Sequence, residues 1–104
     1  MSSKDQSENR APGTVRLTGH IDVPEERSEA VQAALPDHIA LTRAEKGCLS
    51  FEVVPCPRAP HRFLVSELFV DQSAFDAHQK RTKESSWAEV TKDIPREFSI
   101  TVQD

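Results

Sequence analysis

The segment "FLVSELFVDQSAFDAH", residues 63–78, predicts a strand, a tight turn and a helix in direct succession. Both faces of the predicted strand are mainly apolar, because odd and even positions alike carry large hydrophobic side chains. Asp71 follows the strand and is a typical helix N-cap, so we expect a helix over residues 72–81. Two ionisable residues interrupt this pattern. Glu67 lies within the apolar strand, and His78 lies on the helix face that should be buried.

Alternating apolar and polar residues predict three further strands around this segment. They lie at residues 15–22, 48–54 and 97–103, while the central strand takes in residues 62–70. The short connection "PCPRAPH" between the second and third strands favours an antiparallel pair, because a parallel pair needs a much longer crossover.

An amphipathic helix is expected between the first two strands. Its apolar residues recur every four positions, at Val31, Leu35 and Ile39. Asp22 is a candidate N-cap for this helix. Pro36 lacks an amide proton, so it predicts a kink or a break into two helices near residues 32–36. The segment "ESSWAEVTKDI", which contains Trp87, offers a further helical piece before the last strand.

The element order β-α-β-β-α-β predicts an α+β, ferredoxin-like fold, in which a four-stranded antiparallel sheet carries its helices on one face. The strand at 62–70 is apolar on its other face too, and a second copy of the chain would cover that face. We therefore predict a homodimer that packs sheet to sheet, as a dimeric α/β barrel. Residues 14–104 form a single domain, and the polar residues 1–13 predict a flexible N-terminal tail.

Composition restricts the class of protein. The chain has 104 residues and a formal net charge of -4, with 13 basic residues scattered among 17 acids. Nucleic acid and anionic membrane are disfavoured as partners, because both require clustered basic side chains. The apolar runs are too short for a membrane span or a secretion signal, which predicts a cytoplasmic protein. Cys48 and Cys56 bracket a predicted strand and lie too far apart for a disulfide, so free thiols are expected.

Together, "EKGCLSFEVV" at residues 45–54 and "RFLVSELFVDQSAFDAH" at residues 62–78 resemble the antibiotic biosynthesis monooxygenase family. The resemblance spans about residues 14–103 and is carried by Glu45, Gly47, Cys48, Phe51, Phe63, Glu67, Phe69, Asp71, Phe75 and His78. It implies a dimeric, quinol-monooxygenase-like enzyme that oxidises quinols or other electron-rich aromatic substrates with molecular oxygen. It also implies that no metal, flavin or other cofactor takes part.

Some relatives degrade haem instead, and the chain departs from their pattern. Trp87 and Ala88 stand where those relatives place an axial histidine, and Thr18 stands near their strand-one asparagine. Phe69 occupies a position that is commonly tryptophan in the family, and the chain has no tyrosine. Haem is therefore not expected, nor is a mechanism that uses a tyrosine hydroxyl. The remaining histidines show no metal-ligand spacing with one another or with the cysteines.

His78 and Glu67 are the candidate catalytic residues. Imidazole titrates near neutral pH, and a phenolate reacts with oxygen far more readily than a phenol, so His78 is a candidate base. Glu67 would support the polar end of the site. The candidate substrate-binding residues are aromatic and would form the walls of an apolar pocket: Trp87, Phe69, Phe51 and Phe75.

Structural readings of the same residues remain open. His78 can equally be a half-buried histidine bonded to the backbone, and the aromatic residues can simply be core. Glu67 can form an ion pair with Arg16, Arg62 or His20, and it can face either the pocket or the dimer seam. The leading hypothesis is a cofactor-independent monooxygenase. The alternative is a non-catalytic dimeric module that binds a small ligand or a partner protein.

Overall fold

The computed structural model describes residues 13–103, so residues 1–12 of the predicted tail lie outside the described part of the chain. Four strands and three helices follow in the order β1 Val15–Asp22, α1 Glu25–Arg43, β2 Cys48–Pro55, β3 Arg62–Phe69, α2 Gln72–Lys83, α3 Ser86–Val90 and β4 Arg96–Val102. This order confirms the predicted βαββαβ pattern, with α3 as the additional helical piece around Trp87.

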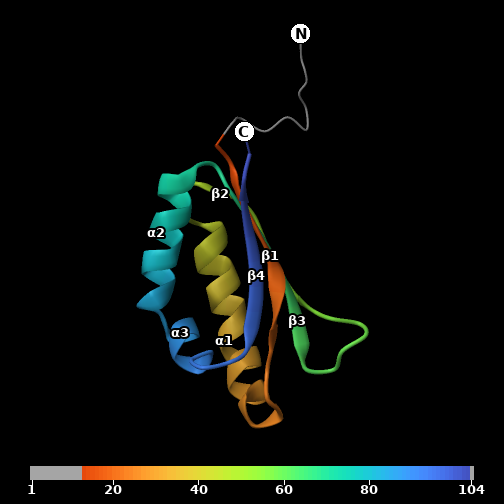
Figure 1. The fold of residues 1–104 in the computed structure, drawn as a ribbon. Helices are drawn as coiled ribbons and strands as arrows, with labels where there is room; N and C mark the ends of the chain where they lie inside the picture. The colour runs from red at the N-terminus through yellow and green to blue at the C-terminus, as the bar shows by residue number, and fades with distance from the viewer. Residues whose placement is uncertain (1–12, 104) are drawn as a thin grey trace.

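The four strands form one antiparallel sheet in the order β2-β3-β1-β4. All three helices lie on the same side of the sheet (Figure 1). This arrangement is the ferredoxin-like fold, in which the two outer strands of the sheet are the second and the last in sequence. The chain therefore has a two-layer architecture with one sheet face covered by helices.

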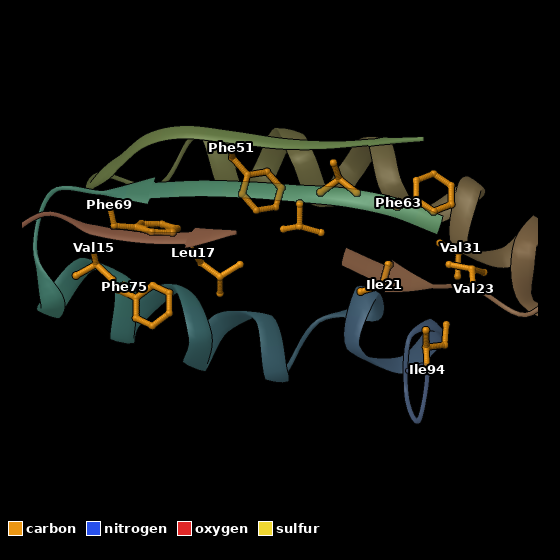
Figure 2. Close-up of a cluster of buried hydrophobic side chains, with 12 residues drawn as sticks. Val15, Leu17, Ile21, Val23, Val31, Phe51, Phe63, Phe69, Phe75 and Ile94 are labelled. Carbon is orange, nitrogen blue, oxygen red and sulfur yellow. The ribbon is translucent and has the colours of Figure 1, made fainter. Parts of the chain in front are cut away.

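Strand register brings the apolar residues together on the covered face. Val15 pairs with Phe69, and Leu17 pairs with Glu67, which also pairs with Phe51 on the far side of β3. Figure 2 shows the apolar members of this set, Val15, Leu17, Phe51 and Phe69, between the sheet and the helices. Full burial of each large apolar side chain contributes about 1.5–3 kcal/mol, so this layer fixes the position of α2 over the sheet.

Two expectations about α1 are corrected. The predicted break near Pro36 is absent, because α1 continues from Glu25 to Arg43 as one helix. Pro36 is solvent-exposed, so water can satisfy the backbone carbonyl group that loses its partner there. Asp22 does not cap the helix; its carboxylate accepts a hydrogen bond of 2.7 Å from Arg62 Nε across the β1–β3 pair.

Gly19 allows β4 to approach β1 closely. A Cβ atom added at Gly19 would lie 2.0 Å from the backbone oxygen of Glu97 and 2.8 Å from the ring of Phe98. Gly19 and Phe98 are direct partners in the strand register. The missing side chain therefore lets the Phe98 ring lie over β1, at the edge of the pocket described next.

Candidate functional site

A pocket of about 400 Å³ lies between the covered face of the sheet and helices α2 and α3. Its inner end is formed by buried side chains from three elements: Phe51 on β2, Glu67 on β3, and His78 on α2. Its outer end is formed by exposed residues at the end of α2 and at the start of β4. The volume suits a small aromatic molecule, since ligand pockets commonly measure roughly 300–1,000 Å³.

The position of His78 follows from the start of α2. The Asp71 carboxylate accepts a hydrogen bond of 2.8 Å from the amide of Ala74 and so caps the helix. Phe75 and His78, three residues apart, then share the face that packs on the sheet. The Phe69 ring lies 4.9 Å from the His78 ring, centroid to centroid, and only 2% of His78 is exposed.

Glu45 determines which nitrogen of His78 carries the proton. His78 Nδ1 lies 2.9 Å from Glu45 Oε1, and a carboxylate can only accept, so Nδ1 donates. The lone pair of the neutral ring is then on Nε2. That atom lies 3.4 Å from Thr82 Oγ1 and 3.7 Å from Glu67 Oε1, at the inner end of the pocket. His78 is thus an oriented proton acceptor.

Arg81 holds Glu45 in place. Its Nε donates to Glu45 Oε2, and its Nη2 donates to Thr42 Oγ1 at 3.1 Å. Burial lowers the pKa of His78, and the Glu45 carboxylate opposes that shift. Because the pKa lies below the ordinary value, His78 is mainly neutral at neutral pH, as a general base must be.

Glu67 faces the pocket, which decides between the two placements that the sequence left open. Only 7% of the Glu67 surface is exposed, and Glu67 Oε1 has no hydrogen-bond partner among the described residues. Burial raises the pKa of Glu67 to about 7, with a further contribution from the Glu45 carboxylate. The three expected basic partners, Arg16, Arg62 and His20, lie at strand positions that point to the opposite face of the sheet.

Replacing Glu67 with glutamine should change how stability depends on pH. A carboxyl group whose folded-state pKa is raised contributes stability below its unfolded pKa and loses it as pH rises through the folded pKa. We therefore expect Glu67→Gln to gain stability relative to the parent protein between pH 4.5 and 7, by up to about 3 kcal/mol. Urea unfolding at pH 4.5 and pH 8 measures this difference. An equal difference at both pH values would contradict it.

An aromatic wall closes one side of the pocket. The rings of His38 and Trp87 stack with centroids 4.6 Å apart and an interplanar angle of 4°. Phe51 meets His38 edge-on at 5.3 Å. Burial lowers the pKa of His38 to about 4, so this histidine is an uncharged aromatic wall at neutral pH.

The predicted site residues therefore separate into two groups. His78, Glu67, Trp87 and Phe51 line the pocket. Phe69 and Phe75 do not line it; they pack against each other with ring centroids 5.7 Å apart. Phe69 also packs against the His78 ring, so it supports the histidine without lining the pocket.

Sequence reasoning missed the residues that orient His78. Glu45 was noted only as part of a family motif, and it lies 33 residues from His78 in the chain. Arg81 follows His78 at the i+3 spacing of one helical turn, which places the two side chains on neighbouring positions of α2. That spacing was the available signal. His38 gave no signal, because its neighbour Trp87 comes from a distant helix.

Within residues 13–103, no group of three or more His, Cys, Asp or Glu side chains is arranged to hold a metal ion. None of the helices in that range is long and apolar enough to cross a membrane. The pocket thus has aromatic walls and the His78 and Glu67 side chains at its inner end, while Glu45 contacts His78 from outside the pocket.

A family model matches most of the chain, and several solved structures share its fold. A family model described as antibiotic biosynthesis monooxygenase matches residues 14–89. A candidate antibiotic biosynthesis monooxygenase from Nitrosomonas europaea superimposes with a TM-score of 0.76 at 19% identity, over 88% of this chain and 91% of that one. PA3566 from Pseudomonas aeruginosa superimposes with a TM-score of 0.75 at 20% identity, over 88% of this chain and 95% of that one. SO0527 from Shewanella oneidensis has a TM-score of 0.67 at 26% identity, over 90% of this chain and 96% of that one. None of the curated proteins matches the chain.

Proposed function

The chain belongs to the antibiotic biosynthesis monooxygenase family, as its match over residues 14–89 shows, and we propose that it oxidises a small electron-rich aromatic or quinol-type substrate with molecular oxygen, without a cofactor. One observation carries the proposal. A buried histidine, oriented by Glu45, presents the lone pair of His78 Nε2 to a pocket walled by Phe51 and the stacked His38–Trp87 pair.

The first chemical step is proton transfer from a substrate hydroxyl to His78 Nε2. The Glu45 carboxylate stabilises the imidazolium that forms, because Nδ1 already donates to it. The resulting phenolate is electron-rich enough to reduce oxygen. For a quinol, one oxygen atom forms a new bond to a ring carbon and the other leaves as water. The ring loses four electrons in all and becomes a hydroxyquinone, so atoms and electrons balance.

Glu67 can return protons during this reaction. Burial raises its pKa to about 7, so near neutral pH the carboxyl group exists in both protonation states. Its Oε1 atom lies 3.7 Å from His78 Nε2, on the pocket side of the histidine. We propose that the protonated carboxyl group supplies a proton to the reduced oxygen atom that leaves as water.

Oxygen consumption tests the proposal. We expect metal-stripped protein to consume oxygen with at least one of a panel of hydroquinones, dihydroxynaphthalenes and anthrones, and to form the oxygenated product, a hydroxyquinone from a quinol or an anthraquinone from an anthrone. An oxygen electrode and product mass spectrometry measure both. The control is the same substrate without protein, which reports autoxidation. If folded protein gives no uptake above that control with any substrate, the proposed activity is wrong and the non-catalytic binding module takes its place.

We also propose that the chain forms a homodimer through the sheet face that no helix covers (Figure 1). Val54 and Leu64 are cross-strand partners on that face and are 44% and 39% exposed. An exposed apolar pair on an uncovered sheet is typical of a surface that packs against another protein. A second copy offers a matching surface by symmetry.

Light scattering and sedimentation test the dimer. We expect twice the monomer mass of 11.6 kDa, and a shift towards the monomer in Leu64→Lys, because a charge on the packed face must be desolvated. Leu41→Lys is the matched control, since Leu41 is an exposed leucine on α1, away from that face. A monomer mass for the parent protein at every concentration would exclude this assembly.

A further inference from the structure

The mouth of the pocket carries a group of cationic side chains that the proposed proton transfer does not use. They come from three successive parts of the chain: Lys83 at the end of α2, Lys92 after α3, and Arg96 at the start of β4. All three are exposed, whereas His78 and Glu67 at the inner end are buried. The pocket thus has an apolar, histidine-containing inner end and a positively charged mouth.

The positive charge at the mouth is local. The whole chain carries a net charge of -4, yet the exposed charged residues that line this pocket are three cations and one acid, Asp93. Ion pairs within residues 13–103 include neither Lys83 nor Lys92. Their charges are therefore available to a ligand, and fields of one sign at a cleft mouth attract ligands of the opposite sign.

Arg96 is held at the mouth by the backbone. Its Nε donates to the Ile94 carbonyl oxygen at 3.1 Å, and its Nη2 donates to the Thr91 carbonyl oxygen. These neutral partners fix the guanidinium without cancelling its charge. Fixing a charge before binding reduces the entropy lost when a ligand contacts it.

We infer that the ligand of this pocket is an aromatic acid: a flat ring system whose hydroxyl group reaches His78 and whose anionic group lies at the mouth beside Lys83 and Lys92. This inference rests on the proposed function for the orientation of the hydroxyl group. The aromatic wall would accept the rings, and the mouth would distinguish an anionic substituent from a neutral one of the same shape.

Binding of non-oxidisable probes tests the inference without any turnover. We expect 2-naphthoate to bind at least about tenfold more tightly than the neutral 2-naphthamide at low ionic strength, as for a carboxylate beside more than one cation. The preference should shrink at 0.5 M NaCl, because salt screens exposed charges. Calorimetry or equilibrium dialysis measures both constants. Naphthalene-2-sulfonate and 2-naphthyl phosphate then rank which anionic group the mouth accepts best.

Two double variants distinguish the effect of the cations at the mouth from the effect of the net charge of the protein. Lys83→Gln/Lys92→Gln should lower the preference for 2-naphthoate over 2-naphthamide to about threefold or less. Lys46→Gln/Lys80→Gln removes the same net charge from exposed positions that do not line this pocket and should leave the preference intact. Equal binding of naphthoate and naphthamide, no naphthoate binding, or equal effects of both double variants would overturn the inference. A preference for the acid in protein that consumes no oxygen would support it while rejecting the monooxygenase proposal.

Discussion

Replacing His78 with alanine should lower oxygen consumption by about 10²–10⁴-fold, the range by which a positioned general base accelerates a reaction. The His78 ring places a lone pair at the inner end of the pocket, with its other nitrogen fixed by Glu45. The fall should appear in kcat more than in KM, because the proton transfer occurs after binding. Steady-state oxygen uptake with the best substrate of the panel measures it.

The controls separate lost chemistry from lost packing. His78 is fully buried, so the alanine variant leaves a cavity and loses stability. His78→Gln fills most of that space without supplying a base, and it should show the same loss of turnover. His61→Ala replaces an exposed loop histidine and should match the parent protein. Turnover within threefold of the parent in both His78 variants would remove the histidine from the mechanism.

The fold was predictable because its determinants are local. Alternation of period two along β1 and β3 fixes which residues face the helices, and register then follows from keeping Leu17 and Phe69 on the buried face. Asp71 caps α2 as predicted, because its carboxylate accepts a hydrogen bond from a backbone amide in the first turn that has no partner within the helix. The chain order of these elements permits few antiparallel arrangements.

The predicted break in α1 and the predicted Asp22 cap are absent for physical reasons. Pro36 costs one backbone hydrogen bond and a steric adjustment, but α1 packs Val31, Leu35 and Ile39 against the sheet on both sides of it. Tertiary packing along a long helix outweighs that local cost. Asp22 would cap a helix in isolation, but Arg62 on the neighbouring strand offers its carboxylate a charged partner.

The site was predictable only in part. His78 and Glu67 could be found from the sequence, because an ionisable residue within an apolar pattern is visible without a structure. The residues that orient His78 could not be found in this way. Glu45 lies beyond the end of α1, and the bend of the chain between α1 and β2 brings it to α2. Contacts between distant segments depend on three-dimensional packing that no local pattern records.

Replacing Glu45 with glutamine should move the proton of the neutral His78 ring from Nδ1 to Nε2. We expect turnover to fall by about 100-fold or more, by analogy with general-base histidines that lose their orienting carboxylate. Arg81 donates to Glu45 Oε2, so the amide oxygen of the glutamine should face Arg81 and its NH₂ group should face His78 Nδ1. Nδ1 must then accept, which places the proton on Nε2. A protonated Nε2 cannot take a proton from the substrate.

The tautomer itself distinguishes this positioning role from a structural one. Nitrogen-15 chemical shifts of His78 should report Nδ1–H in the parent protein and Nε2–H in Glu45→Gln, with KM changed by less than about threefold because Glu45 lies outside the pocket wall. Glu52→Gln, at an exposed position on β2, is the matched control and should change neither tautomer nor rate. If Glu45→Gln loses activity while His78 keeps its proton on Nδ1, the carboxylate acts by another route. If the tautomer reverses and turnover persists, His78 Nε2 is not the base.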